Sequence, residues 1–428
     1  MTEPHAHSLD VKRGAALYVG ALIGPGVLLV PALAVDAAGP ASILAWAALL
    51  VLSAPLAVTF AALGVRHPVA GGVTAYVREG LGDAAAAVTG GFFVAAVFCG
   101  GPAVALIGGF YVADLTGSGT PVAAAAGLGM FGTVLAANAF GLRVSSGFQL
   151  VLASVLVVVI ASAIAVALPS RGGDNWQPFA PHGWWAVGTA ANILVWLFVG
   201  WEAGAQLAGD FRAPDRDLPR AMTLAFAVVT VLYCGLGAAT IAVTSGSDSR
   251  VPLADLIAVG FGHAGRDATA VLAVALTMGT MNVYIAGASK LIASLGLEGA
   301  LPRVLAGDSH RSVPRRPLVL IAVPGVVLLG ALVAGFSSTD ALIRATSACF
   351  IGVYVLALLS AVRILEGSTR VLAAFTFALV LVLGGFSGWY LAVPLVAGVA
   401  ALGVRRAVVR RDDAGSSALR RQDRPDCR

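Results

Sequence analysis

One carboxylate lies deep inside an apolar run of this 428-residue chain. Glu202 follows Gly200 and Trp201 in a stretch otherwise made of apolar and small residues. A charged carboxylate in hydrocarbon is costly, so an acid at such a position is a functional candidate that carries a proton or acts as a gate. The alternative is a structural brace, in which the carboxyl accepts hydrogen bonds from the backbone amides of an unwound segment.

Two apolar runs contain sequences that interrupt an α-helix. Gly24-Pro25-Gly26 stands in the middle of the first run, where the proline removes a backbone donor and the glycines admit strained dihedral angles. In the other run, Gly200 lies two residues before Glu202 and is a position where the helix is expected to unwind. Broken helices in corresponding positions of two halves point to a transporter's substrate site. The alternative is a pair of kinked but continuous helices with packing glycines.

The two predicted breaks supply groups that bind an α-amino acid. The half-helix that begins near Gly26 and Val27 presents free N–H groups and the positive end of its dipole, which suit a carboxylate. Carbonyl oxygens freed at Ile23, Phe198 and Val199 suit an ammonium group. The substrate-binding residues predicted at the breaks, including Trp201 as a cover over the site, are Ile23, Gly24, Pro25, Gly26, Val27, Phe198, Val199, Gly200 and Trp201.

The composition places these residues in a membrane protein. Hydrophobic residues make up 58% of the chain and charged residues 11%, whereas soluble domains carry about 25% charged residues. The mean hydropathy is +0.90, which excludes a soluble multidomain enzyme. The cysteines lie far apart without a Cys-x-x-Cys pair, so we expect neither disulfides nor a metal site. The net charge of +5 does not indicate nucleic acid, because the basic residues lie in loops between apolar runs.

Apolar segments bounded by polar, glycine or proline residues predict an all-α polytopic membrane protein with twelve transmembrane helices. A helical span needs about 20 largely apolar residues, and the alternation typical of a membrane β-barrel is not found in the sequence. The predicted spans are 14–37, 41–65, 86–113, 121–140, 146–168, 186–210, 220–244, 267–295, 317–336, 340–362, 370–386 and 388–404.

The loops that carry lysine and arginine alternate along the chain, and cytoplasmic loops retain positive charge. This pattern predicts that the N-terminal segment 1–13 and the basic tail 405–428 both lie on the cytoplasmic side of the cell membrane. The first apolar run is not a secretory signal, because it is interrupted and further spans follow it. The tail is expected to be disordered near anionic headgroups, or alternatively only to set the topology.

Several motifs resemble those of the amino acid/polyamine/organocation (APC) transporters, over about residues 12–404. They are the Gly-Pro-Gly break, a Pro-x-x-Gly-Gly sequence at 68–72, and the loop 211–221 with the sequence Phe-Arg-Ala-Pro-Asp-Arg-Asp-Leu-Pro-Arg-Ala. The chain departs from the family's pattern at Ala213, where Asn is usual, and at Pro25, where many members have Ser or Thr. Within the superfamily it resembles the bacterial exporters of methionine and branched-chain amino acids.

The resemblance implies a transporter domain over 14–404 that works by alternating access. It implies two inverted five-helix repeats, at about 14–168 and 186–362, with broken first and sixth helices and two additional helices at about 370–404. It also implies that Asn282 of the eighth span faces the substrate. A role in bridging two helices is the alternative for Asn282.

Three classes of function compete for this chain: a secondary transporter, a channel and a membrane-embedded enzyme. A channel needs rings of polar side chains, and an enzyme needs a catalytic constellation at depth, yet all six histidines lie outside the predicted spans. No GxxxxGK[ST] sequence occurs, so we expect neither ATP-driven transport nor a cofactor. Small apolar residues at the breaks favour neutral aliphatic amino acids, and the resemblance implies methionine, leucine, isoleucine or valine among them. We predict proton-coupled export, with an importer or exchanger as the alternative.

Overall fold

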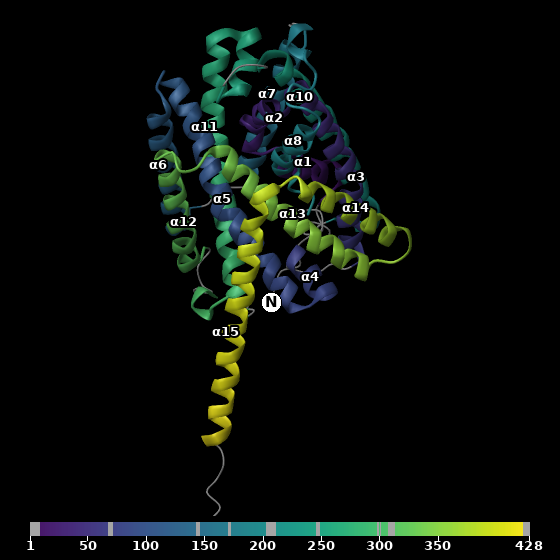
Figure 1. The fold of residues 1–428 in the computed structure, drawn as a ribbon, viewed down its shortest axis with the longest axis vertical. Helices are drawn as coiled ribbons and strands as arrows, with labels where there is room; N and C mark the ends of the chain where they lie inside the picture. Colours follow the sequence, from purple (N-terminus) through teal and green to yellow (C-terminus); the bar gives the residue numbers. More distant parts are fainter. Residues whose placement is uncertain are drawn as a thin grey trace, which may run out of the picture.

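The protein is a bundle of helices (Figure 1). The computed structural model describes residues 9–66, 72–142, 146–169, 173–202, 211–244, 249–297, 299, 301–306 and 313–422. Within these ranges the structure contains helices, short 3-10 turns and loops but no β-strand, and one isolated bridge pairs Leu9 with Phe211. Ten helical stretches in this part of the chain are long and apolar enough to cross a membrane.

The helices are, in chain order, α1 (Val11–Leu22), α2 (Val30–Ala38), α3 (Ser42–Arg66), α4 (Val73–Leu81), α5 (Asp83–Leu115), α6 (Thr120–Ala139), α7 (Ser146–Ala167), α8 (Trp185–Leu194), α10 (Pro214–Thr244), α11 (Pro252–Leu297), α12 (Arg315–Val333), α13 (Thr339–Ile364), α14 (Gly367–Gly385) and α15 (Ala392–Gln422).

Ten of the predicted spans each overlap one of the ten candidate membrane helices. The other two predicted spans, 14–37 and 186–210, do not form single continuous helices in the part of the chain that is described. They are the two spans whose sequences contain the predicted interruptions. The fold is therefore that of a multi-pass membrane protein in which two of the predicted spans are interrupted.

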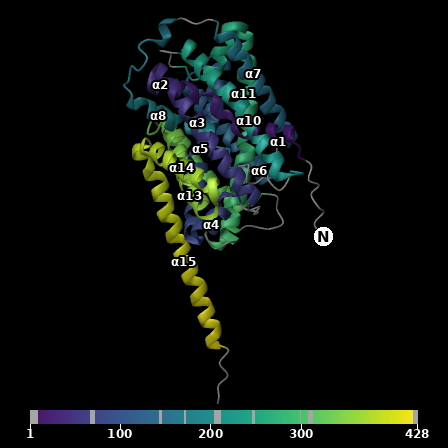
Figure 2. The same ribbon diagram turned by 90° about the vertical axis from the view of Figure 1, so that its right-hand side faces the viewer.

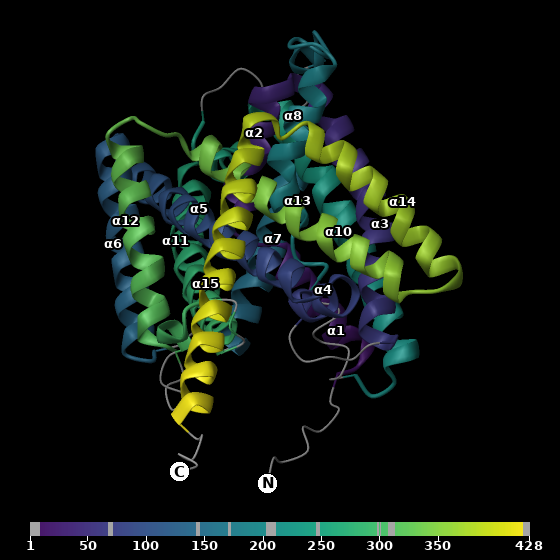
Figure 3. The same cartoon turned by 60° about the horizontal axis from the view of Figure 1, so that its bottom comes forward.

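Helix α5 runs through the middle of the bundle and is buried along most of its length. It contacts α6, α11, α13 and α15, and Figure 3 shows α6 and α12 beside each other on one flank of it. A Cβ atom at Gly109 would overlap the carbonyl oxygen of Ala123 in α6, so these two helices approach at backbone distance. Small residues at such contacts are typical of helix packing in membranes.

The structure corrects the sequence interpretation at three elements. The loop after the second span contains the helix α4. Helix α11 begins at Pro252, well before the predicted start at 267, and bends at Gly262, whose φ is 60°. The tail expected to be disordered continues α15 as a helix to Gln422 and projects from the body (Figures 1 and 2). Alanine and arginine are good helix formers, so the polar segment propagates the helix that the apolar segment begins.

Candidate functional site

The first predicted break is present in the structure at the Gly-Pro-Gly sequence. Helix α1 ends at Leu22, and the N–H of the capping residue Ile23 donates to the Val19 carbonyl oxygen at 2.8 Å. The chain then forms a 3-10 turn, Pro25–Leu28, before α2 begins at Val30. Pro25 has no N–H to donate back to the preceding turn, which is the physical reason that the helix stops here.

The break borders free space at Gly24. A Cβ atom built on Gly24 would meet no heavy atom within 4 Å, and this residue is only half-buried. Its neighbours Ile23 and Val27 are each 1% exposed. The carbonyl oxygen of Ile23 accepts no hydrogen bond from another described residue. The first break therefore offers an open backbone surface with a free acceptor inside an apolar surround.

The second break follows α8. A 3-10 turn, Val195–Phe198, ends this helix, Val199 is extended with φ −75° and ψ 130°, and Gly200 has a φ of 138° that favours glycine. Trp201 and Glu202 continue in a turn. The rest of the predicted span, 203–210, lies outside the described residues.

The two breaks pack directly against each other. A Cβ atom at Gly26 would lie 2.7 Å from Cδ2 of Leu197, which belongs to the second break. A Cβ atom at Gly200 would lie 3.1 Å from the carbonyl oxygen of Ala21, in the last turn of α1. Segments more than 170 positions apart in the chain thus meet at two glycines, and larger side chains would separate them.

One tyrosine joins the two breaks, and the sequence interpretation did not select it. The hydroxyl of Tyr233 in α10 lies 2.8 Å from the carbonyl oxygens of both Leu22 and Leu197, and it is the donor in both contacts. Its ring packs edge-on against Phe198 and Trp46, with centroids 5.2 and 5.3 Å away. A buried tyrosine normally finds a partner for its hydroxyl, so a tyrosine in the middle of an apolar span was the available signal.

A second tyrosine supports the first break from α5. The hydroxyl of Tyr111, which is fully buried, donates to the carbonyl oxygen of Leu28 at 2.8 Å. This oxygen belongs to the 3-10 turn between α1 and α2. Carbonyl groups that leave a helix inside a membrane need such partners. The turn is therefore anchored to the central helix of the bundle.

Glu202 braces the unwound chain of the second break. Its Oε2 atom accepts hydrogen bonds from the N–H of Gly200 at 3.0 Å and from the hydroxyl of Tyr354 at 2.7 Å. Tyr354 belongs to α13, and its ring lies 5.9 Å from that of Phe60 in α3. The carboxyl group thus connects the break to a neighbouring helix. This geometry matches the structural alternative for Glu202, and the proton-carrying role stays a prediction.

Trp201 lies in the protein interior. Its side chain is fully buried, its ring lies 6.1 Å from that of Phe226 in α10, and its indole N–H has no acceptor among the described residues. The side chain fills the space between the second break and α10. The role of Trp201 as a cover over a bound substrate stays a prediction.

The structure does not bring Asn282 into the cluster of break residues. Its side-chain amide donates to the Leu142 carbonyl oxygen at 3.3 Å, and Asn138 donates to the backbone oxygen of Asn282 at 3.4 Å. These contacts connect α11 to α6 and the chain just after it, as in the helix-bridging alternative. The neighbouring Met281 packs in a separate apolar cluster together with Phe131.

The chemistry of this site is that of backbone and carboxyl groups. Among the described residues, no group of three or more His, Cys, Asp or Glu side chains could hold a metal ion. The arrangement provides carbonyl oxygens, glycine-lined backbone and one carboxyl group within apolar packing. Such a set can bind a small zwitterion through the backbone.

The fold is shared with a known transporter of inorganic ions. A crystal structure of a mutant manganese transporter from Eremococcus coleocola superposes with a TM-score of 0.57 at 12% sequence identity, and the match covers 93% of this chain and 92% of that one. At this identity the similarity concerns the fold. The chain is therefore a multi-pass helical membrane protein with the architecture of a transporter.

The sequence comparisons define the family. Residues 9–404 match the amino acid permease family. YecA, an amino acid permease of Bacillus subtilis (strain 168), is 33% identical over 91% of this chain and 93% of its own length. YjeH of Escherichia coli (strain K12), an L-methionine/branched-chain amino acid exporter, is 30% identical over 89% of this chain and 92% of its own length. The chain belongs to the amino acid permease family of the APC superfamily, whose members transport amino acids across membranes.

Proposed function

We propose that this chain is a secondary active transporter that exports neutral aliphatic amino acids across the cell membrane by alternating access. The observation that carries the proposal is the meeting of two interrupted helices at Gly26 and Gly200, where the Tyr233 hydroxyl contacts carbonyl oxygens of both. Broken helices that meet inside a membrane bundle provide a backbone site for a charged small molecule. Membership of the amino acid permease family supports an amino acid as that molecule.

The first break is the proposed binding surface for the α-amino and α-carboxyl groups. In the turn Pro25–Leu28, Pro25 has no N–H and the Val27 N–H donates to the Gly24 carbonyl oxygen at 3.3 Å, so the Gly26 N–H is the group that suits the carboxylate. The free carbonyl oxygen of Ile23 suits the ammonium group. The open space at Gly24 gives the substrate backbone access to both.

The surrounding side chains favour a neutral aliphatic substrate. Ile23, Val27 and Phe198 are buried within one apolar cluster. The Oε2 atom of Glu202 already accepts two hydrogen bonds, so it is poorly placed as a counter-charge for a basic side chain. The reported substrates of YjeH, methionine and the branched-chain amino acids, have the same character. We therefore propose methionine, leucine, isoleucine and valine as substrates.

Glu202 is the proposed proton-coupling group. It is tied to the second break through Gly200 and to α13 through Tyr354. A separation of these two elements during transport would change the number of donors to the carboxylate, and with it the balance between its charged and protonated forms. In this proposal, the carboxyl group with its hydrogen bonds to Gly200 and Tyr354 is one of the states through which Glu202 passes during transport.

The proposed topology has twelve spans with both termini in the cytoplasm. The first span is α1, the turn Pro25–Leu28 and α2, and the sixth begins with α8. Two inverted five-helix repeats hold these broken spans, and α14 and α15 are the two additional helices. The alternation of basic loops supports the cytoplasmic location of the termini.

Overexpression in a bacterial host tests substrate and direction together. Export predicts a lower intracellular concentration of methionine, leucine, isoleucine or valine and tolerance to their toxic analogues, relative to cells that express the Gly26→Val variant. Greater sensitivity to the analogues would favour the alternative, an importer or exchanger. Unchanged sensitivity to analogues of all four amino acids at equal expression would contradict the proposed substrate class.

A further inference from the structure

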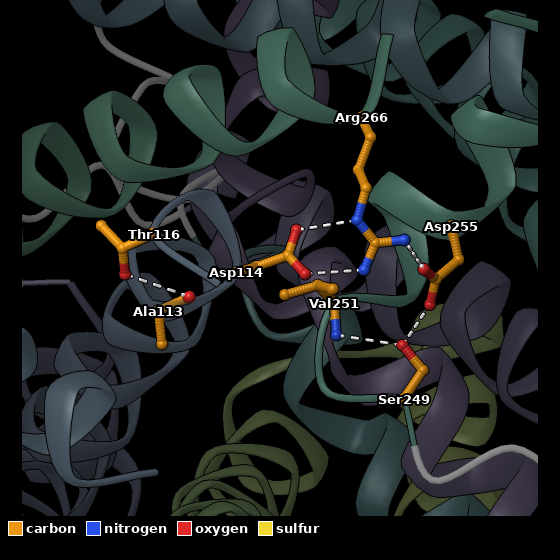
Figure 4. Close-up of polar contacts among 7 residues, drawn as sticks. All are labelled: Ala113, Asp114, Thr116, Ser249, Val251, Asp255 and Arg266. Atoms are coloured by element: carbon orange, nitrogen blue, oxygen red, sulfur yellow. Dashed lines mark hydrogen bonds and ion pairs between the residues drawn. The ribbon is translucent and has the colours of Figure 1, made fainter. Parts of the chain in front are cut away.

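Three charged side chains, those of Arg266, Asp114 and Asp255, meet between α5 and α11 (Figure 4). Arg266 binds Asp114 with two parallel hydrogen bonds, Nε to Oδ2 at 2.9 Å and Nη2 to Oδ1 at 2.6 Å. Its Nη1 atom donates to Oδ1 of Asp255 at 2.5 Å. Paired guanidinium and carboxylate groups of this geometry form strong, directional hydrogen bonds.

The hydrogen-bonding atoms of the two carboxylates find their donors in Arg266 and in Ser249, which lies just before α11. The second oxygen of Asp255 accepts a hydrogen bond from the hydroxyl of Ser249, whose oxygen in turn accepts one from the N–H of Val251 at 3.2 Å. The side chains of Arg266, Asp114 and Asp255 are 30%, 19% and 22% exposed. All four carboxylate oxygens of Asp114 and Asp255 thus have hydrogen-bond donors. This is expected of an ion cluster that holds chain segments together, rather than of a ligand site.

This ion cluster connects α5 to both parts of α11, the first arm before the bend at Gly262 and the longer second arm after it. Asp255 lies in the first turn of α11, Arg266 follows the bend at Gly262, and Asp114 is in the last turn of α5. The bend lies at the end of the bundle opposite the projecting half of α15 (Figures 1 and 2). With the termini in the cytoplasm, this end faces outward.

The first arm of α11, residues 252–261, reaches into the core above the first break. Leu253 and Leu256 are buried in the same apolar cluster as Val27 and Leu28. Helix α11 also contacts the 3-10 turn Pro25–Leu28. The arm therefore lies between the outer end of the bundle and the proposed binding surface.

A cavity lies beside the ion cluster, at the start of the first arm of α11. Its volume is about 680 Å³, and its wall includes Phe110, Asp114, Asp255 and Arg266. Phe110 precedes Tyr111, the residue that holds the Leu28 carbonyl oxygen. The cavity thus lies beside the part of α5 that anchors the first break, with the start of α11 and the ion cluster in its wall.

We propose that Arg266, Asp114 and Asp255 form an outer latch that holds the first arm of α11 against α5 and must open for the binding surface to reach the outer side. This inference rests on the proposed transport function and adds the element that closes the outer path. Loss of Arg266 would remove three charge-assisted hydrogen bonds from the closed state, so the arm would leave its buried position more often.

A cysteine reporter on the arm measures this opening without any transport. Ala254 is fully buried in the arm, and Ala254→Cys is placed in a variant whose native cysteines are replaced by alanine or serine. The rate of labelling by a charged methanethiosulfonate reagent is then followed in lipid nanodiscs, where both faces are accessible. Arg266→Gln and Asp114→Asn should each raise this rate on the order of tenfold.

The chain offers a matched control for these two variants. Arg344 pairs with Asp340 at 2.9 Å with similar side-chain exposures of 23% and 31%, but both residues lie in α13. Arg344→Gln should leave the labelling of Ala254→Cys unchanged. Equal labelling rates in the parent, Arg266→Gln and Asp114→Asn proteins would overturn the latch.

A crosslink covers the case in which a charge-neutral variant fails to fold. Asp114→Cys and Arg266→Cys are joined by a short, reducible bis-methanethiosulfonate in the variant without native cysteines, and amino acid exchange is measured before and after crosslinking. Exchange should stop on crosslinking and return on reduction. Persistent exchange in the crosslinked protein would also overturn the latch. Faster labelling in Arg266→Gln without amino acid exchange by the parent would instead contradict the proposed function and leave the latch standing.

Discussion

The hydroxyl of Tyr233 provides the sharpest test of how the two breaks are held together. Tyr233→Phe removes the donor that lies 2.8 Å from the carbonyl oxygens of Leu22 and Leu197. The phenyl ring keeps the edge contacts with Trp46 and Phe198. The substitution therefore changes hydrogen bonding and leaves the apolar packing in place.

The expected effect follows from the burial of the two acceptors. One hydroxyl proton serves two carbonyl oxygens, so the loss is close to that of one buried partner, about 1–3 kcal/mol. This energy corresponds to a shift of about 5- to 150-fold in the equilibrium between packed and separated breaks. Because each break loses a partner, both segments should open more often.

Hydrogen–deuterium exchange in nanodiscs measures these openings directly. Peptides that cover 19–30 and 195–200 should exchange faster in Tyr233→Phe by a factor within the stated range. Tyr76→Phe is the control, because the buried Tyr76 hydroxyl has no hydrogen-bond partner among the described residues. Exchange rates in both peptides that equal those of the control would refute the assignment of Tyr233 as the shared donor.

Three further substitutions test individual parts of the site. Glu202→Gln keeps an oxygen acceptor for Gly200 and Tyr354 but cannot ionise, so proteoliposomes should retain amino acid exchange and lose accumulation driven by a pH difference; accumulation that persists would leave the carboxyl as a brace only. Gly26→Val should abolish transport while membrane insertion stays intact, because its side chain would meet Leu197; normal flux through the inserted variant would contradict this. Gly200→Ala should cost about 1–3 kcal/mol through its φ of 138° and lower the thermal midpoint of the purified protein, whereas Gly24→Ala, with φ −107°, should not; equal midpoints would remove the argument from backbone strain.

The sequence predicts the breaks well because their causes are local. Pro25 between two glycines prevents a continuous helix wherever the segment lies, and α1 accordingly ends at Leu22. Gly200 similarly marks the point where the chain after α8 takes a positive φ. The contact between the two breaks depends on packing between distant segments, so no local pattern contains it.

The polar partners of the site are not predictable from local sequence. Tyr233 and Tyr354 come from α10 and α13, and only the folded bundle brings them to Leu22 and Glu202. Asn282 was expected to face the substrate, but its side-chain amide donates a hydrogen bond to the Leu142 carbonyl oxygen just after α6. A buried polar group requires a partner, but the sequence does not say which one.

The helix ends show the same division between local and tertiary causes. Helix α11 extends back to Pro252 because Leu253 and Leu256 bury an apolar face in the core. A search for uninterrupted apolar spans misses this arm, since Arg266 and Asp267 separate it from the longer run. The ion cluster at Arg266 likewise joins residues that are separate in sequence.

Counterflow in proteoliposomes tests the central claim most directly. Vesicles that contain the purified protein are loaded with unlabelled methionine and diluted into a trace of labelled methionine, with leucine, isoleucine and valine tested in the same way. A transporter with its site at the two breaks should accumulate label transiently, and Gly26→Val vesicles should not. Absence of counterflow for all four amino acids, with correctly inserted wild-type protein, would contradict the proposed function.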